Sequence, residues 1–439
     1  MKKSLILGAA AMAALVAVPQ ANAADVKVGG YYMMRAVNQD TTILEDNTKD
    51  DTQGWFQRVQ LNIDAKISDK TSAHLHTRIL GTSDTIEGGT AVNAQDSDGA
   101  MDVKRAWMET EVMGVTVKAG NMPLSINDKL LFKDDGGSFG TILLAKSFGS
   151  VTVVALNVRG DEGETTGVNA DSDDANIYGL SLIGKASNLS YQLTWAHLNV
   201  EDDYGYTAAT AESYGTSSDG TTVTATTTAA TTESRSGIAD STNNWVALTV
   251  GADMGGLKLT GTGIYETGHS QDGVSGDAAD GGFMGALRVK GKTGFGGWNA
   301  YGFYAAESFN HPVESYTSSR VNQGFSKTWF QGGPGGTVVM ESWANNGSGN
   351  LENVMGAGVG LNVKAGSWSV KPAVDFATVV DDAGIASKSA YGGSLYLTTA
   401  LDKGASFSLV GIYVKPTDDS ATDDIGAMQA LQSEFKVAF

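Results

Sequence analysis

The most informative part of the sequence is its closing stretch, Leu431-Gln432-Ser433-Glu434-Phe435-Lys436-Val437-Ala438-Phe439. Its odd positions are apolar apart from Ser433, and its even positions carry Gln432, Glu434 and Lys436. An alternation of period two indicates a β-strand with one apolar and one polar face. Such a strand, ending on the aromatic Phe439, is typical of a membrane barrel, which closes its last strand onto its first so that no edge is unpaired in lipid.

The beginning of the chain has the pattern of a cleavable leader. Lys2 and Lys3 precede an apolar run over residues 5–18, and Pro19-Gln20-Ala21-Asn22-Ala23 follows. Ala21 and Ala23 match a small-residue cleavage site, so we expect a signal peptide over residues 1–23 and a mature chain over 24–439. The alternative is a helical membrane anchor, for which the run is short. No later stretch approaches the roughly 18 uninterrupted apolar residues that a membrane-spanning helix needs.

The composition excludes several classes of function. The net charge is −19, and removing Lys2 and Lys3 with the leader makes it −21, which argues against a nucleic-acid partner. The chain has no cysteine, so it can form neither a disulfide nor a thiolate metal site. No seam rich in proline or charge divides residues 24–439, which we therefore interpret as one domain.

Apolar–polar alternation between turn residues predicts an all-β chain of eighteen strands. The predicted strands cover residues 26–37, 54–66, 71–80, 101–112, 115–120, 139–147, 151–159, 176–185, 189–199, 243–252, 256–267, 282–291, 297–306, 351–364, 367–379, 390–400, 404–414 and 427–439.

Connections between these strands alternate strictly between short turns and long polar loops. This pattern predicts a transmembrane antiparallel barrel with short periplasmic turns and long extracellular loops, and an even number of strands. Sixteen strands would result if the pair 282–291 and 297–306 were misread. Twenty would result if Phe325–Gln331 and Thr337–Trp343 entered the wall, although we interpret them as a hairpin in a surface loop. The threonine-rich loop 200–242 is predicted to be mobile surface.

Four consecutive strands carry an arginine on their polar face. Because charge is unfavourable against lipid, the polar face must point into the lumen, although Lys104 interrupts the alternation of its strand. The set is Arg35, Arg58, Arg78 and Arg105, with Lys118 on the fifth strand. They form either a basic wall patch or an ordinary charged lining, because one sequence does not fix the register.

The third long loop, 121–137, is unusually apolar. Ile126, Leu130 and Leu131 could share one side of a short helix, so we expect the loop to pack against the inner wall and narrow the pore. The alternative is a helical turn that caps the outer rim.

These features together resemble the general trimeric porins of Gram-negative outer membranes. The chain is most similar to the porins of sulfate- and metal-reducing bacteria. The resemblance implies a homotrimer, contacts with lipid and lipopolysaccharide, and recognition of Phe435, Val437 and Phe439 by the barrel-assembly machinery. In these porins, carboxylates of the third loop face arginines of the wall. The matching positions are Asp128, Asp134 and Asp135 on the loop, opposite Arg35, Arg58, Arg78 and Arg105, while Lys129 and Lys133 depart from an acidic loop.

Other chemistry receives little support. His74 and His76 share a strand face, as two metal ligands could, but no Cys or third His is near in sequence, so polar lining is favoured. No nucleophile motif is present, and we expect neither an enzyme nor a cofactor. Carboxylates gather in the loops, where Asp96-Ser97-Asp98-Gly99 is a fragment of a calcium pattern; a solvated surface is the simpler interpretation.

We therefore expect a passive, water-filled channel for small hydrophilic solutes in the outer membrane, since barrels of 16 to 18 strands enclose an aqueous passage. The excess negative charge predicts a preference for cations. Two alternatives stay open, namely an adhesive barrel whose loops bind a surface partner and a channel selective for one substrate.

Overall fold

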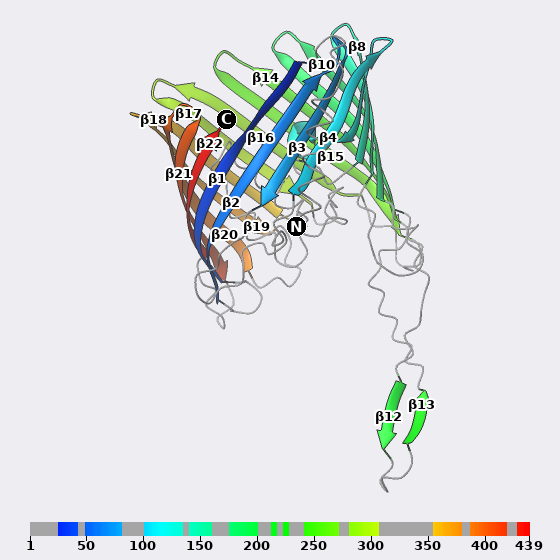
Figure 1. The fold of residues 1–439 in the computed structure, drawn as a ribbon, viewed down its shortest axis with the longest axis vertical. Coiled ribbons are helices and arrows are strands. Elements are labelled where there is room, and N and C mark those ends of the chain that lie inside the picture. Colours follow the sequence, from blue (N-terminus) through cyan, green and yellow to red (C-terminus); the bar gives the residue numbers. More distant parts are fainter. Residues whose placement is uncertain are drawn as a thin grey trace.

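The computed structural model describes residues 25–42, 49–80, 101–134, 140–159, 175–200, 212–216, 223–227, 241–271, 281–306, 354–379, 387–418 and 428–439. Most of them belong to one antiparallel sheet that curls into a barrel (Figure 1). The leader, with Ala21 and Ala23, lies outside the described residues. No helix in the described ranges is both long and apolar enough to cross a bilayer.

Eighteen strands form the wall. They are β1 (Asp25–Thr42), β2 (Lys49–Lys66), β3 (Thr71–Leu80), β4 (Met101–Val112), β5 (Val115–Asn121), β8 (Gly140–Phe148), β9 (Val151–Arg159), β10 (Ala175–Ala186), β11 (Leu189–Val200), β14 (Ser241–Asp253), β15 (Leu257–Gln271), β16 (Phe283–Thr293), β17 (Gly296–Ala305), β18 (Val354–Ala365), β19 (Trp368–Val379), β20 (Ser387–Asp402), β21 (Ala405–Asp418) and β22 (Met428–Ala438).

The predicted count of eighteen strands is confirmed. The alternative of sixteen fails because β16 and β17 pair with each other and both belong to the wall. The alternative of twenty fails because β17 pairs directly with β18, which leaves no place for two more strands between them. The proposed hairpin over 325–343 lies outside the described residues.

The barrel closes where its last strand meets its first. β22 pairs antiparallel with β1, and Gly30 and Phe439 exchange two backbone hydrogen bonds of 3.0 and 3.1 Å. A closed ring leaves no row of unpaired amide and carbonyl groups at a sheet edge. The predicted last strand therefore closes the wall.

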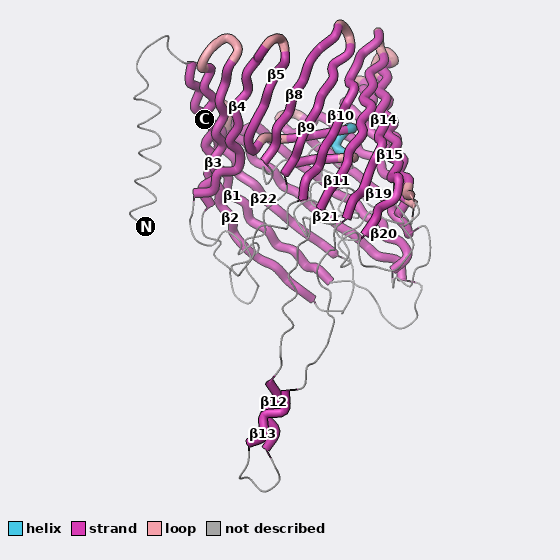
Figure 2. The backbone as a smooth tube through the Cα atoms, turned by 90° about the vertical axis from the view of Figure 1, so that its right-hand side faces the viewer, coloured by secondary structure: helices cyan, strands magenta, loops and turns pink. Residues whose placement is uncertain are grey.

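Connections sort by length to the two ends of the barrel, as Figures 1 and 2 show. One end carries only tight turns, in which Met113 and Gly114 both have positive φ (53° and 73°), as a two-residue type I′ hairpin turn requires. In the turn after β2, Lys66 Nζ donates a hydrogen bond of 2.9 Å to Asp69, which holds the pKa of the Asp69 carboxyl below its usual value. The threonine-rich loop contains a short hairpin of β12 (Glu212–Thr216) and β13 (Val223–Thr227), apart from the wall.

The two faces of the wall follow the predicted alternation. The contact of Arg288 with Asp128 of the third loop places Arg288 on the inner face, while its apolar neighbour Leu287 is exposed on the outside. Arg35 and Glu434 pair across the neighbouring strands β1 and β22 on the polar face, and Met34 is exposed on the other. The irregular position Lys104 has a structural cause. His76 pairs with Arg105 and Thr77 pairs with Val103, so Lys104 is the extra residue of a β-bulge.

The outer surface is apolar and bordered by aromatic rings at both ends. Towards the long connections, the exposed rings are Tyr178, Tyr265, Phe283, Tyr304, Phe376, Tyr391 and Tyr413. Towards the tight turns, they are Phe148, Phe295, Trp368 and Phe439. Leucine and valine dominate between them, for example Leu180, Leu248 and Val359. An apolar band between two aromatic girdles is the surface that a barrel presents to lipid.

Candidate functional site

The third connection folds into the barrel. After β5, the chain forms β6 (Leu124–Ile126), the 3₁₀ turn η2 (Asn127–Lys129) and β7 (Phe132–Asp134), and β6 pairs with β7. Figure 2 shows η2 among the wall strands rather than beyond their ends. The expected short helix is thus a single 3₁₀ turn at the tip of a small hairpin, and the alternative of a cap on the outer rim does not hold.

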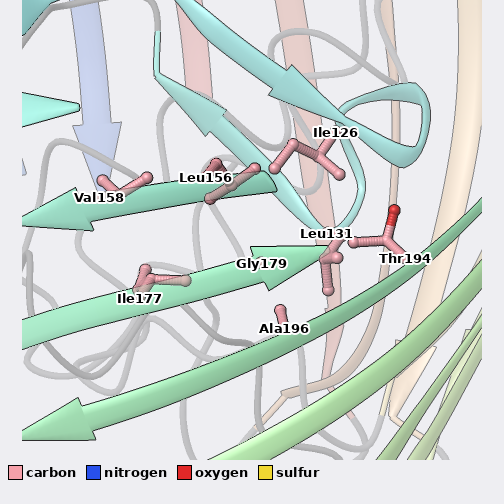
Figure 3. A pocket seen from close by; sticks show the side chains of 8 residues that line it. All are labelled: Ile126, Leu131, Leu156, Val158, Ile177, Gly179, Thr194 and Ala196. Carbon is pink, nitrogen blue, oxygen red and sulfur yellow. The ribbon is translucent and has the colours of Figure 1, made fainter. Parts of the chain in front are cut away.

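An apolar anchor fixes this loop to the wall. Ile126, Leu130 and Leu131 are 6%, 0% and 1% exposed. Ile126 and Leu131 line a small pocket against β9, β10 and β11 (Figure 3), where the wall contributes Leu156, Val158, Ile177, Gly179, Thr194 and Ala196. These wall residues point inward, yet most are apolar. The hydrophobic effect therefore favours the loop in this position over a hydrated one.

Polar contacts of Asn127 fix the tip of the loop. The Asn127 side chain is fully buried, and its Nδ2 donates to the Gln192 carbonyl (3.1 Å) and to Thr249 Oγ1 (3.2 Å). Its backbone N–H donates to Gln192 Oε1 at 3.2 Å. Asn127 and Asp128 have φ of 50° and 56°, in the left-handed region where Asn and Asp are the best tolerated non-glycine residues. The tip is therefore bound to β11 and β14.

An ion pair ties the same tip to a third strand. The Asp128 carboxylate accepts a hydrogen bond from the Arg288 guanidinium on β16, and the two side chains are 24% and 12% exposed. In the wall order, β16 lies nine strands from β3, which is half of the ring of eighteen. Asp128 was expected opposite the arginines of β1 to β4. Its ion pair is with Arg288, a wall residue outside that set, and the apolar anchor holds the loop against β9 to β11.

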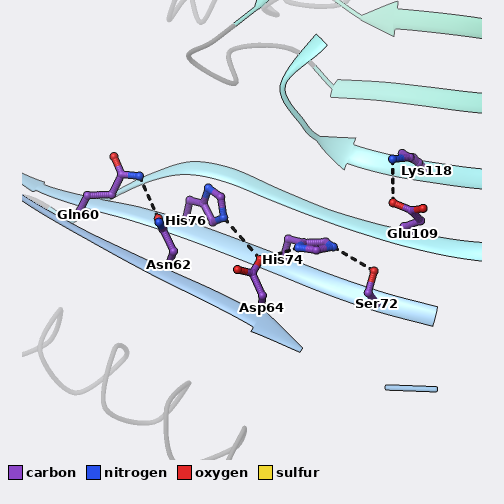
Figure 4. Close-up of polar contacts among 8 residues, drawn as sticks. All are labelled: Gln60, Asn62, Asp64, Ser72, His74, His76, Glu109 and Lys118. Carbon is purple, nitrogen blue, oxygen red and sulfur yellow. Dashed lines mark hydrogen bonds and ion pairs between the residues drawn. The ribbon is translucent and has the colours of Figure 1, made fainter. Parts of the chain in front are cut away.

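The predicted basic wall residues all belong to β1 through β5. Arg35 donates to Glu434 on β22 at 2.8 Å, and Lys118 pairs with Glu109 on β4 at 2.8 Å (Figure 4). Register places Arg58, Arg78 and Arg105 on the inner face, each diagonally offset from the next, since Gln60 pairs with Arg78 and His76 pairs with Arg105. The backbone of Asp134 ends β7, and Asp135 lies outside the described residues.

Sequence reasoning missed Arg288, Glu434, Gln192 and Thr249 as partners. For Arg288 a signal existed, because Arg288, Lys290 and Lys292 alternate with Leu287 and Val289, which predicts an inward basic face for this strand. For Gln192 and Thr249 no local signal exists, because their role depends on where the loop lands.

A second inner-wall cluster lies on β2, β3 and β4 (Figure 4). Asp64 Oδ1 is 2.6 Å from His74 Nδ1 and 3.7 Å from His76 Nε2. The ring of Trp107 stacks on His74, with centroids 4.3 Å apart, and meets His76 edge-on at 5.2 Å. The two histidines were expected to be polar lining of the lumen, and the fold brings them together with a carboxylate and an indole.

Comparison with known proteins identifies the fold. No protein-family model matches the chain, and no curated protein sequence matches it. Among solved structures, Pseudomonas aeruginosa OpdK with vanillate aligns with a TM-score of 0.56 at 11% identity, over 94% of this chain and 98% of that one. Pseudomonas aeruginosa OccK11 (OpdR) aligns with a TM-score of 0.55 at 9% identity, over 94% of this chain and 96% of that one. A BenF-like porin from Pseudomonas fluorescens Pf-5 aligns with a TM-score of 0.55 at 9% identity, over 94% of this chain and 98% of that one. The chain therefore shares the fold of these proteins, a closed antiparallel barrel of eighteen strands.

Proposed function

We propose that the protein is an outer-membrane porin, a passive water-filled channel for small hydrophilic solutes and ions. The supporting observation is the closed wall with an apolar, aromatic-bordered outside and a polar inside into which the third loop folds. A barrel of this strand number encloses a passage for water, and the loop narrows it. The contacts of η2 lie on β11, β14 and β16, so the passage runs between the loop and the arginine-bearing strands β1 to β4.

Conductance in planar lipid bilayers tests this proposal. The folded barrel, purified in detergent, is expected to insert and give ohmic steps that scale with salt concentration. Neutral polymers of graded size then measure the exclusion limit. A folded barrel that inserts without passing current would refute the channel function.

Ion preference depends on two opposing contributions. The net charge of −19 raises the local concentration of cations and favours a cation-preferring channel. Arginines and lysines on the inner wall act against it, although Arg35, Lys118 and Arg288 are each paired with a carboxylate. We propose that the channel prefers cations over anions. The sign of the reversal potential in a salt gradient tests this preference. A reversal potential whose sign indicates anion preference would show that the positive charge of the inner wall outweighs the negative net charge of the chain.

A substrate-selective channel is the second candidate. The loop tip is held by three hydrogen bonds and an ion pair, so the constriction is rigid enough to discriminate shape, and an aromatic group, Trp107, lies on the inner wall. A structure of similar fold was solved with vanillate. Conductance that saturates with one solute, or is blocked by it, would favour this candidate over the general channel.

Assembly and location follow from the resemblance to trimeric porins. We propose a homotrimer in the outer membrane, surrounded by lipid and lipopolysaccharide and inserted by the barrel-assembly machinery through Phe435, Val437 and Phe439. Cross-linking in intact membranes, followed by mass measurement of the unheated species, is expected to give three copies. A single copy would refute the trimer while leaving the channel function intact.

A further inference from the structure

The cluster of Asp64, His74, His76 and Trp107 has the components of a transition-metal site. His74 and His76 alternate on β3 and therefore project from the same face, into the lumen. Asp64 pairs directly with His74 across β2 and β3, which places its carboxylate between the two imidazole rings. One strand thus provides two nitrogen ligands, and its neighbour provides an oxygen.

The distances between the Asp64 oxygen and the two imidazole nitrogens differ from those around a bound metal ion. Zinc binds imidazole nitrogen and carboxylate oxygen at about 2.0–2.2 Å, so two tetrahedral ligand atoms lie roughly 3.3 Å apart. The Asp64 oxygen is 2.6 Å from one ring nitrogen and 3.7 Å from the other. The shorter distance is a hydrogen bond, and within the described ranges no group of three such side chains is arranged as a metal site as it stands. For both distances to reach ligand spacing, the Asp64 oxygen must lie about 0.7 Å farther from His74 Nδ1 and about 0.4 Å closer to His76 Nε2.

Neighbouring side chains fix the orientations of the two imidazole rings. Trp107 stacks on His74 with an interplanar angle of 10°, and its edge contact with His76 is at 76°. Ser72 Oγ lies 3.0 Å from His74 Nε2. A hydroxyl can donate or accept, so Ser72 can accept from Nε2–H when Nδ1 binds a metal ion. A partner of this kind on the far nitrogen is the usual support for a metal-binding histidine.

The chemistry of the set selects the class of ion. Calcium and magnesium prefer oxygen ligands, whereas two imidazoles and one carboxylate suit Zn²⁺, Cu²⁺ or Ni²⁺. Arg105, which pairs with His76, opposes a bound cation, and Glu109, two residues beyond Trp107, is engaged by Lys118. Binding must therefore come from the ring nitrogens rather than from an acidic field. Asp64 is 44% exposed by side chain, so hydrated ions in the lumen can reach it.

We propose that Asp64, His74 and His76 form a binding site for a divalent transition-metal ion on the inner wall of the barrel. Bound metal adds positive charge and volume to the wall of the passage. It therefore lowers conductance and shifts selectivity away from cations, an effect that rests on the proposed channel function. The binding itself does not depend on that function.

Titration calorimetry of the folded barrel with Zn²⁺ and with Cu²⁺ tests the site directly. One saturable site is expected, with no comparable heat from Mg²⁺. His76→Gln and His74→Gln are expected to weaken binding by about tenfold or more, since even supporting partners of a ligand change affinity about 10–100-fold. His197→Gln is the matched control. His197 faces outward between Tyr178 and Trp195, so its substitution is expected to leave binding unchanged.

A wild-type barrel without saturable Zn²⁺ or Cu²⁺ binding, or equal binding in all three variants, overturns the proposal. Before titration, the folding of each variant is checked by its heat-modifiable mobility on gels. In bilayers, the metal ion is expected to reduce the conductance of the wild-type barrel, and a chelator is expected to restore it. His76→Gln is expected to abolish this effect of the metal ion. Saturable binding in a barrel that carries no current would sustain the metal site and refute the channel function, so the two failures are distinguishable.

Discussion

Asp128 and Arg288, which are 160 residues apart in the chain, form an ion pair that joins the tip of the third loop to β16. Both side chains are largely shielded from solvent, so the pair is less screened than one at the surface. Together with the hydrogen bonds of Asn127, this contact turns a loop into a fixed part of the lumen.

Breaking this ion pair is expected to loosen the constriction. In Asp128→Asn the acceptor loses its negative charge, so the ion pair is removed although the amide oxygen can still accept a hydrogen bond from Arg288; hydrogen bonds to charged groups contribute about 1.5–3 kcal/mol. We expect noisier single-channel current and a larger exclusion limit, measured with neutral polymers. Asp402→Asn is the control, because Asp402 lies next to an exposed turn. An unchanged exclusion limit in Asp128→Asn would show that the apolar anchor alone holds the loop.

The apolar anchor is expected to matter more than the ion pair. Leu130 is completely buried, and removing a buried leucine side chain costs about 2–5 kcal/mol. Leu130→Ala is expected to free the loop and raise conductance while the wall stays folded. Leu180→Ala removes the same atoms from an outward position that is 46% exposed, and conductance should not change. Folding is monitored by heat-modifiable mobility on gels.

Closure of the barrel is expected to depend on Gly30. A Cβ at this position would lie 3.1 Å from the Phe439 ring and within overlap of the Gln60 carbonyl. Gly30→Ala is therefore expected to destabilise the seam by about 1–3 kcal/mol, the usual cost of overpacking. Gly411→Ala is the matched control on another strand, because nothing lies within 4 Å of its Cβ position. Unfolding in urea in the presence of lipid vesicles compares the two. Equal midpoints would contradict the close approach of Gly30 both to Gln60 on β2 and to Phe439 at the seam.

Charge on the arginine-bearing wall is expected to tune selectivity. Arg105→Gln removes a positive charge from the inner face, so the reversal potential in a salt gradient should move towards cations. Lys403→Gln makes the same change of charge in an exposed turn outside the lumen and should have a smaller effect. The shift should also decrease at high salt, since screening shortens the reach of a wall charge. An equal shift in both variants would place Arg105 away from the ion path.

The fold was predictable because its main signal is local. Alternation with period two assigns each residue to one of two faces, and most strand boundaries lie within a few residues of the prediction. At β4 the alternation failed at Lys104, and the failure marks a bulge rather than an error in the strand. The inward face of Arg288 was equally readable, although its partner was not.

The alternating pattern, the number of strands and the polarity of the two faces could be read from the amino-acid sequence alone. These follow from side chains only one or two residues apart. The register, the closure of β22 on β1, the course of the third loop and the contacts of Asp64 with His74 and His76 arise only in the folded barrel. These contacts join residues far apart in the chain. Their formation depends on ring closure and on how well apolar surfaces fit, and no local period encodes either.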